Sequence, residues 1–400
     1  MPRRQRWTPV KGTGNRVYDT RERLVLGALD LPGRAAAAIA RGLGLGGAAS
    51  SIDPARLQDV LVLRLDRIGD VLMSLPALQD LRRALPRARI RLAVGRWSED
   101  VARGAPVDEV LVWSAPWAGR PEEGADTLRE LWRKARGLSG LDLALDLQGD
   151  VRSSLLLWLT GARVRAGYAN TGGAYLLTHV IPLDETVSWV DQNRAAVASL
   201  VGQATQPPRG DALFVPERGE AAALLARLGL GARRPLVGIH PGGGRRVKQW
   251  DARRWGAVGA RLQRELGAAL AAAVASQLPE PPMDLTGRLS LRETLTLLSA
   301  LDLFLSPDTG PMHMASAVGT PSVSVFGPSD PARYFSGTAY DPEGVRHRVV
   351  RRELWCSPCN LIRKPPAECD AGTPECLQLV TVDEVYEVAR FLLRGIEKVG

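Results

Sequence analysis

The sequence lacks any long hydrophobic run. No apolar segment in its 400 residues reaches the roughly 18 residues that a membrane-spanning helix needs. The N-terminus carries positive charges, but no continuous apolar core follows them, so we expect neither a membrane span nor a secretory signal. These absences predict a cytoplasmic protein, with a peripheral contact to the inner membrane as an alternative that stays open.

The positive charge of the chain comes without a nucleic-acid-binding motif. The sequence has 52 basic and 43 acidic residues, which gives a formal net charge of +9. Such an excess suits an anionic partner, either a phosphate-bearing substrate or a charged membrane surface, although an Arg-rich proteome explains it as well. Because no recognised motif accompanies the charge, we do not expect nucleic acid as a partner.

Two α/β domains are expected to follow an N-terminal extension that covers residues 1–56. The extension is expected to be partly disordered. Its segment 21–44 has the basic and apolar sides of a helix that lies on a membrane or packs on its own domain, broken at Pro32. Strand, turn and helix then alternate, which predicts parallel sheets covered by helices. A linker with two adjacent prolines divides the chain into domains at 57–205 and 206–380.

Two turns at strand ends carry candidate chemistry. The first holds Gly69 and Asp70, where Asp70 is either a helix cap or a reactive group. The second, at 240–250, has three consecutive glycines that can form a backbone nest for an anion, with Lys248 just beyond them to neutralise phosphate charge. It does not match the Walker A pattern. His240 is interpreted as a structural residue at a strand end.

A third turn, "SPDTGPMHM" at 306–314, has the features of a helix N-terminus that binds phosphate. Pro311 suits the first helical turn, and Asp308 and Thr309 can cap the helix. Gly310 lets the backbone approach a ligand closely. The N–H groups and the positive end of the helix dipole attract phosphate. A well-capped helix without a ligand is the alternative.

Four blocks together resemble glycosyltransferase family 9, which includes the lipopolysaccharide heptosyltransferases: "RIGDVLMSLPAL", "LDLQGDVRSSLL", "GIHPGGG" with "VKQW", and "SPDTGPMHMASAVGTPSVSVFGPSDP". The resemblance implies a GT-B fold, in which two Rossmann-like domains face each other across a cleft and the C-terminal helix, residues 381–400, packs back on the N-terminal domain. It also implies an inverting, metal-independent transfer of a sugar from a nucleotide donor, ADP-heptose in the best-known members, with no cofactor required for catalysis.

The resemblance further implies roles for single residues. Asp70 is expected to be the general base, with Asp66 as the fallback, and Arg67 and Gln148 are expected on the acceptor side. The residues expected at the donor phosphates are Gly242, Gly243, Lys248, Asp308, Thr309, Gly310, Met312 and His313. One base and a cationic phosphate site suffice for inversion. The carboxylate pair of a retaining glycosidase does not stand out.

The segment after residue 266 departs from the family pattern. Family members have a strand here, then a Gly-rich turn and an acid that holds the donor, whereas residues 267–280 are rich in alanine and predict a second helix. We therefore expect an internal strand to be missing. The donor site is then either weakened or altered, or the alanine-rich helix fills the gap in the sheet.

All four cysteines lie within a short segment near the C-terminus, and they are Cys356, Cys359, Cys369 and Cys376. In a cytoplasmic chain this clustering favours a structural zinc site over disulfides, and free thiols in a packed loop are the third possibility.

Three functions fit these patterns. The leading one is a family 9 glycosyltransferase with a nucleotide-sugar donor and a lipid-linked anionic glycan acceptor, such as a lipopolysaccharide core. A different GT-B enzyme, such as a nucleotide-sugar epimerase, would need more acids and histidines in the cleft, and the chain has four histidines. A non-catalytic relative with an impaired donor site, which binds glycan or membrane, is the alternative that the apparent strand loss supports.

Overall fold

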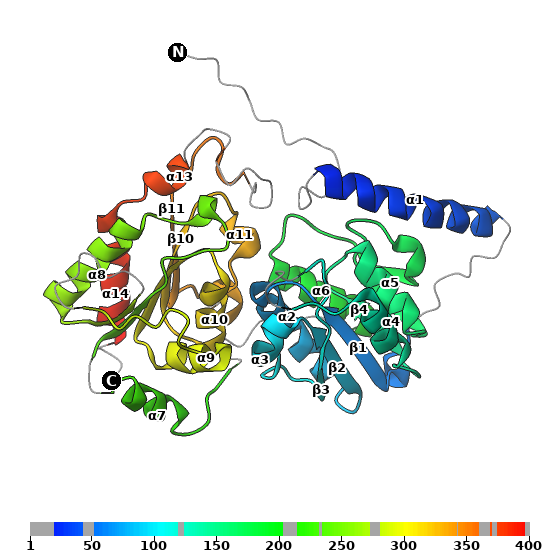
Figure 1. Ribbon diagram of the computed structural model, residues 1–400, viewed down its shortest axis with the longest axis horizontal. Coiled ribbons are helices and arrows are strands. Elements are labelled where there is room, and N and C mark those ends of the chain that lie inside the picture. Colours follow the sequence, from blue (N-terminus) through cyan, green and yellow to red (C-terminus); the bar gives the residue numbers. More distant parts are fainter. Residues whose placement is uncertain are drawn as a thin grey trace, which may run out of the picture.

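The computed structural model describes residues 20–42, 52–118, 124–202, 214–231, 234–272, 281–341, 343–359, 369 and 374–396. The expected disorder near the N-terminus and the domain boundary near residue 205 lie outside these residues. Figure 1 shows two lobes, each built around one sheet. Among the described residues, no helix combines the length and the apolar composition that a bilayer-spanning segment requires.

The first domain contains a six-stranded parallel sheet in the order β3-β2-β1-β4-β5-β6. Its strands are β1 (Asp59–Arg64), β2 (Arg89–Val94), β3 (Glu109–Val112), β4 (Leu143–Asp146), β5 (Val164–Gly167) and β6 (His179–Val180). Its helices are α1 (Thr20–Gly42), α2 (Ile68–Ala84), α3 (Glu99–Ala102), α4 (Leu128–Arg136), α5 (Val151–Leu159) and α6 (Trp189–Val201), with short 3₁₀ turns at Pro54–Arg56, Arg96–Ser98 and Ala174–Leu176.

Both faces of this sheet are covered, because side chains of a strand alternate between its two sides. Val60 and Val62 of β1 join a core that includes α2 and α6. Leu61 and Leu63 join a second core on the opposite face, formed with α4 and α5. The continuous apolar run of β1 therefore fits a strand that is buried on both sides.

The second domain contains a five-stranded parallel sheet in the order β11-β10-β9-β7-β8. Its strands are β7 (Leu236–Ile239), β8 (Ala269–Ala272), β9 (Leu303–Pro307), β10 (Ser322–Phe326) and β11 (His347–Arg351). Its helices are α7 (Glu220–Arg227), α8 (Ala252–Leu266), α9 (Leu291–Ala300), α10 (Gly310–Val318), α11 (Pro331–Tyr334), α12 (Gly337–Tyr340), α13 (Glu375–Gln378) and α14 (Val382–Ile396), with a 3₁₀ turn at Arg246–Lys248.

The strand that the sequence appeared to lack is present, so that prediction was wrong. Gly267 ends α8 in the left-handed conformation, at φ 63°, and the chain then enters β8, which pairs in parallel with β7 along its whole length. The four residues Ala269–Ala272 are alanine or leucine, which favour a helix in isolation, but burial against β7 overrides that preference. The turn expected after this strand, at 273–280, lies outside the described residues.

The C-terminal helix packs on the second domain, not back on the first as expected. Buried Val385, Tyr386 and Ala389 of α14 share a core with α8 and with the second sheet. The Tyr386 hydroxyl also donates a hydrogen bond to Glu265 at the end of α8, at 2.5 Å. Figure 1 shows α14 beside α8 in the same lobe. The amphipathic face of α14 is therefore used within the second domain.

The helix α1 is continuous through Pro32, where a break was expected. It packs on its own domain, since the buried Asp30 carboxylate accepts a hydrogen bond from the Gly173 N–H at 2.7 Å. Gly33 leaves room for the Tyr175 ring, because a Cβ at this position would lie 2.1 Å from it. Of the two interpretations of the segment 21–44, packing on its own domain is the one that the structure supports.

Direct contacts join the two domains. The helix α10 of the second domain packs against α2 of the first, and the Tyr340 hydroxyl donates to the Leu72 carbonyl at 2.9 Å. The Arg333 guanidinium stacks over the Trp189 ring, 4.4 Å from its centroid, and donates to the Asp184 carbonyl at 2.7 Å. The helix starts that carry the candidate site are thus held close together.

Candidate active site

The acid of the first candidate turn lies in the opening turn of α2. An Asp70 carboxylate oxygen accepts a hydrogen bond from the Arg67 N–H at 3.3 Å, as in a capping box. The Asp70 side chain keeps 18% of its surface exposed. The Asp70 carboxylate therefore caps the helix and still remains accessible to a ligand. Its capping bond does not exclude a chemical role.

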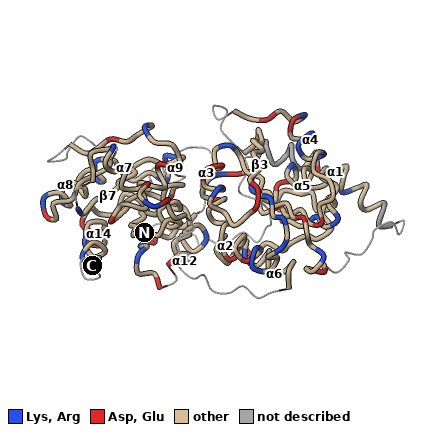
Figure 2. The backbone as a smooth tube through the Cα atoms, turned by 90° about the horizontal axis from the view of Figure 1, so that it is seen from below, with Lys and Arg blue, Asp and Glu red and all other residues tan. Residues whose placement is uncertain are grey.

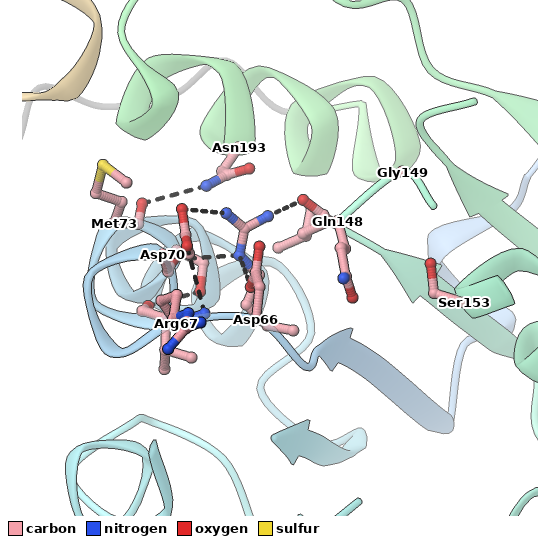
Figure 3. Close-up of polar contacts among 12 residues, drawn as sticks. Asp66, Arg67, Asp70, Met73, Gln148, Gly149, Ser153 and Asn193 are labelled. Atoms are coloured by element: carbon pink, nitrogen blue, oxygen red, sulfur yellow. Dashed lines mark hydrogen bonds and ion pairs between the residues drawn. The ribbon is translucent and has the colours of Figure 1, made fainter. Parts of the chain in front are cut away.

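A buried arginine, Arg64, fixes the position of Asp70, which lies close to Asp66 and Arg67 at the start of α2 (Figure 3). Arg64 ends β1, and its Nη2 lies 3.4 Å from Asp70 Oδ1, while its Nε lies 3.1 Å from Asp66 Oδ1. The Arg64 guanidinium also donates to the carbonyls of Asp70 and Leu147. Burial lowers the pKa of Arg64, but Asp66 and Asp70 outweigh burial and raise it, so this group is a permanent positive charge.

A buried acid, Asp146, ends the neighbouring strand β4. Asp146 accepts hydrogen bonds from the Gln148 N–H at 2.8 Å, the Gly149 N–H at 3.2 Å and the Ser153 hydroxyl at 2.6 Å. Burial raises the pKa of Asp146 to about 6, although these hydrogen bonds oppose the rise. The Gln148 Oε1 atom is buried and has no hydrogen-bond partner among the residues that the structure describes. Arg67, the other residue expected on the acceptor side, is exposed.

Sequence analysis did not single out Arg64 or Asp146. A signal was available, because Arg64 closes an apolar strand and Asp146 closes another. Leu63 pairs with Asp146 in the sheet, and the carboxyl ends of parallel strands meet at one edge, where ligands bind. Polar residues that end two such strands were therefore candidates for one site.

On the second domain, the predicted phosphate residues Lys248 and Asp308 bind each other. Lys248 Nζ lies 2.5 Å from Asp308 Oδ2, and the two side chains are 17% and 5% exposed. The Ser329 hydroxyl donates to the same carboxylate oxygen. Asp308 therefore does not cap α10, as the sequence suggested, but holds the lysine at the strand end.

The N-terminus of α10 has no side-chain cap. Thr309 occupies the capping position in an extended conformation without a capping hydrogen bond, so the expected Thr309 cap is absent as well. The Gly-rich turn lies against it, since a Cβ at Gly243 would be 3.2 Å from Thr309 Cγ2. Gly242 lies beside the His240 ring, and burial lowers the pKa of His240. The two predicted phosphate segments thus meet in space.

Met312 lies in the first turn of α10. Its side chain is fully buried with Phe326 and Phe335, and its N–H donates to the Thr309 carbonyl at 3.1 Å. The side chain of Met312 is therefore not exposed at the start of α10, and its expected role at the phosphates stays a prediction. Pro311 has no N–H group, and that of Met312 is bonded to Thr309. Gly310 is therefore the residue at the start of α10 whose backbone N–H is considered for a phosphate.

His313 joins the two halves of the site. Its Nδ1 lies 2.8 Å from the Ser336 hydroxyl, and the opposite edge of its ring faces Gly69, where a Cβ would lie 2.7 Å from the ring. Glycine is thus required at position 69 for this approach. Burial lowers the pKa of His313 to about 4, against the opposing influence of Asp308 and Asp70, so the ring is neutral at pH 7.

The four cysteines do not form a metal site in the part of the chain that the structure describes. No group of three or more His, Cys, Asp or Glu residues there is arranged to hold a metal ion, and all four thiols are free. Burial and the other cysteines raise the pKa of Cys376 to about 11. The zinc and disulfide predictions therefore find no support.

A comparison with known families identifies this arrangement. The model for glycosyltransferase family 9 (heptosyltransferase) matches residues 129–366. The chain belongs to glycosyltransferase family 9. It is thus a glycosyltransferase of the heptosyltransferase type, as the resemblance of its four blocks predicted.

Curated relatives and solved structures agree with this family. The chain is 25% identical over 295 residues to lipopolysaccharide heptosyltransferase 1 of Salmonella typhimurium, which covers 68% of this chain and 89% of the relative. It is 26% identical over 327 residues to the Pseudomonas aeruginosa enzyme of the same name, covering 75% and 85%.

Among solved structures, a family 9 glycosyltransferase of Veillonella parvula has a TM-score of 0.73 at 23% identity, covering 87% of this chain and 100% of that one. The Escherichia coli ADP-heptose lipopolysaccharide heptosyltransferase II has a TM-score of 0.67 at 23% identity, covering 85% and 100%. These similarities confirm the predicted GT-B fold.

Proposed function

We propose that this family 9 glycosyltransferase moves a heptose-like sugar, with inversion, from a nucleotide diphosphate donor to a lipopolysaccharide core or another surface glycan. ADP-heptose is the donor that the name of the structurally similar Escherichia coli enzyme suggests, and the names of the curated relatives suggest the acceptor class.

One observation carries the proposal. The start of α2, with Asp70, lies directly against the start of α10, because the His313 ring packs on Gly69. A partly exposed carboxylate at the start of α2 therefore lies on the opposite side of the Gly69–His313 contact from the domain that carries the uncapped start of α10 and Lys248. A base opposite a phosphate site is the arrangement that inverting transfer from a diphosphate donor requires.

In the proposed reaction, Asp70 takes the proton of the acceptor hydroxyl as its oxygen attacks the anomeric carbon. The bond from that carbon to the diphosphate breaks, and the nucleoside diphosphate leaves with the bonding electrons. Its growing negative charge is stabilised by Lys248 and by the backbone N–H groups at Gly243 and Gly310. Arg64 holds the base in place throughout. Lysine and backbone N–H groups supply the positive end of the site, so we propose that catalysis needs no metal.

Asp308 takes a different role from the one that the resemblance implied. A carboxylate would repel a phosphate, and that of Asp308 is already bonded to Lys248 and Ser329. We assign it the task of holding the Lys248 ammonium at the strand end. Lys248 and Thr309 thus remain the side chains nearest the proposed diphosphate.

Gln148 and Arg67 are assigned to the acceptor. The buried Gln148 Oε1 lacks a partner among the described residues and can accept a hydrogen bond from a sugar hydroxyl. The exposed Arg67 can bind an anionic group of the glycan. The alternative of a degenerate binding module loses its main argument, because the strand β8 is in place.

Paired substitutions at the two candidate bases test the proposal. Asp70→Asn keeps the size of the side chain but cannot take a proton, so kcat should fall by about 10²–10⁴-fold. Binding of ADP-heptose, measured by calorimetry, should change little. Asp66→Asn is the matched control, since Asp66 also contacts Arg64, and it should keep most of the activity.

The outcomes separate the parts of the proposal. Full activity of Asp70→Asn with loss in Asp66→Asn would transfer the base to Asp66. Failure of the wild-type chain to bind any nucleotide diphosphate sugar would remove the donor assignment. The anomeric configuration of the product, read by NMR, tests inversion independently of both variants.

A further inference from the structure

The helices α4 and α5 expose large apolar side chains on the surface of the first domain. Both pack on the same face of the first sheet, through a shared core that includes Leu131 and Leu157. Their exposed apolar residues are Leu128 at 68%, Trp132 at 50%, Leu155 at 45% and Trp158 at 51% of full exposure. In α5 the buried Ser153, Leu156 and Leu157 lie on the side of the helix away from Leu155 and Trp158, although Val151 on their own side is buried as well.

A row of arginines runs beside these apolar side chains. Arg129, Arg133 and Arg136 are exposed on α4, and their spacing of four and three residues places them along one side of the helix. The single acid within α4 is Glu130, and its carboxylate is bonded to Thr127 in a capping box. We call the four apolar residues and these three arginines the α4–α5 face.

The helix α1 extends the same end of the molecule. Figures 1 and 2 both show α1, α4 and α5 gathered at the end of the first domain that lies away from the second. Leu31 and Ile39 of α1 are 62% and 64% exposed. Exposed apolar side chains are thus present on all three helices at this end of the molecule.

We infer that the α4–α5 face docks on the surface of an anionic lipid bilayer. Tryptophan and leucine insert at the boundary between head groups and acyl chains, while arginines beside them attract anionic head groups. A second copy of the chain is a poorer occupant. A two-fold contact through this face would bring two rows of arginines together with a single acid on each helix.

If the proposed function holds, docking at this face also affects where a lipid-anchored acceptor lies. The helix α5 begins at Val151, just after Gln148 at the end of β4. The helix α5 therefore starts close to a residue that is assigned to the acceptor, while Trp158 lies near the other end of the helix. A bilayer against α4 and α5 would hold a lipid-anchored glycan at the domain that carries this residue.

Vesicle binding by the full chain tests the inference. The probes are vesicles of phosphatidylglycerol and phosphatidylethanolamine, and vesicles of phosphatidylcholine as the neutral counterpart, measured by co-sedimentation. We expect binding to the anionic vesicles. The triple variant Arg129→Gln, Arg133→Gln, Arg136→Gln should bind about 100-fold more weakly, and the double variant Trp132→Ser, Trp158→Ser at least about tenfold more weakly.

Matched controls come from the second domain. Trp355 is 81% exposed, so Trp355→Ser removes a similar apolar surface. Arg253, Arg264 and Arg394 are exposed on α8 and α14, so replacing all three by glutamine removes the same charge elsewhere. Both controls should bind vesicles like the wild type. Equal loss in the controls, or wild-type binding by the α4–α5 variants, would overturn the inference. So would a change from dimer to monomer in the Trp132→Ser, Trp158→Ser variant without a change in vesicle binding.

A transfer assay separates this inference from the proposed function. The α4–α5 variants should transfer sugar to a lipid-free acceptor fragment at the wild-type rate and lose rate only with acceptor embedded in vesicles. Asp70→Asn should fail on both acceptors. If the wild type transfers to neither acceptor, the proposed function fails, while the vesicle-binding result still decides the docking surface.

Discussion

The two sides of the candidate site are built by different means. On the first domain, charged side chains form the site, with buried Arg64 between Asp66 and Asp70. On the second domain, the backbone forms most of it, through the uncapped start of α10 and the Gly-rich turn against Thr309. Lys248 supplies a cation there and keeps 17% of its side chain exposed.

This difference follows from the two chemical tasks. A general base has to meet one hydroxyl in one geometry, so its carboxylate must be held from several directions. A diphosphate has many oxygens, and backbone N–H groups at a helix start present an anion site that the fold itself fixes. Removing Arg64 from the first side should therefore mainly lower the stability of the protein. Removing Lys248 from the second side should mainly weaken the interaction with the donor.

Loss of Arg64 should have the largest effect on stability. Arg64→Met removes a buried charge and leaves Asp66, Asp70 and the Leu147 carbonyl without it. Removing one partner of a buried ion pair costs about 3–5 kcal/mol in the free energy of unfolding. Denaturant unfolding of the variant and the wild type measures this loss.

Arg64→Lys is the control for Arg64→Met. Lysine restores the charge but cannot reach the two acids and the Leu147 carbonyl together. It should recover part of the stability and part of the transfer rate. A fully stable Arg64→Met protein would show that the arginine does not hold this side of the site together.

Loss of Lys248 should reduce activity more than stability. Lys248→Met removes the cation that is proposed to stabilise the leaving diphosphate, and kcat/KM should fall by about 10²–10³-fold. The midpoint of unfolding should also fall, because the buried Asp308 carboxylate loses its ion pair, but by less than in Arg64→Met, since Ser329 still bonds Asp308. Steady-state kinetics and thermal unfolding of one preparation check both statements.

A double-mutant cycle with Asp308 sharpens this prediction. If Asp308 acts only by holding the lysine, Asp308→Asn should add almost no further loss to Lys248→Met. A large additional loss in the double variant would mean that Asp308 acts on the donor independently of the lysine.

The sequence predicted the elements whose pattern is local. The apolar run of β1 and the amphipathic final helix were recognisable, whereas Gly69, which was predicted in a turn before the helix, lies inside α2. The strand β8 was not, because Ala269–Ala272 has the composition of a helix and becomes a strand only through pairing with β7. The partner of α14 was equally hidden, since an amphipathic face does not say which core it joins.

The same limit applies to the site. Residue types and spacing indicated Asp70, Lys248 and the start of α10, but Asp308 was misread as a cap. Its pairing with Lys248 spans 60 positions in the sequence, so no local pattern reveals it. Arg64 and Asp146 depend in the same way on the adjacency of β1 and β4.

The smallest predicted effect concerns His313, which lies between the two sides. Its pKa in the folded protein is about 4, below the ordinary value of 6.5, because burial penalises the charged ring. As the pH falls below 6.5, the unfolded chain therefore takes up the proton first. The neutral His313 ring makes its full contribution to the free energy of unfolding above pH 6.5. This contribution is lost as the pH falls toward 4. Between pH 7 and pH 5 the loss from this group is about 2 kcal/mol.

Comparison with His313→Asn isolates this loss from other titrating groups. Asparagine keeps a polar atom near the Ser336 hydroxyl that bonds His313 Nδ1, but it does not titrate. His347 has a similarly lowered pKa of about 4 and destabilises both proteins in acid, whereas the raised pKa of Asp146 acts in the opposite direction in both. Between pH 7 and pH 5, the free energy of unfolding should therefore fall by about 2 kcal/mol less in His313→Asn than in the wild type. Equal pH dependence in the two proteins would mean that the ring takes up its proton in the folded state, and the contact with Gly69 would then open in acid.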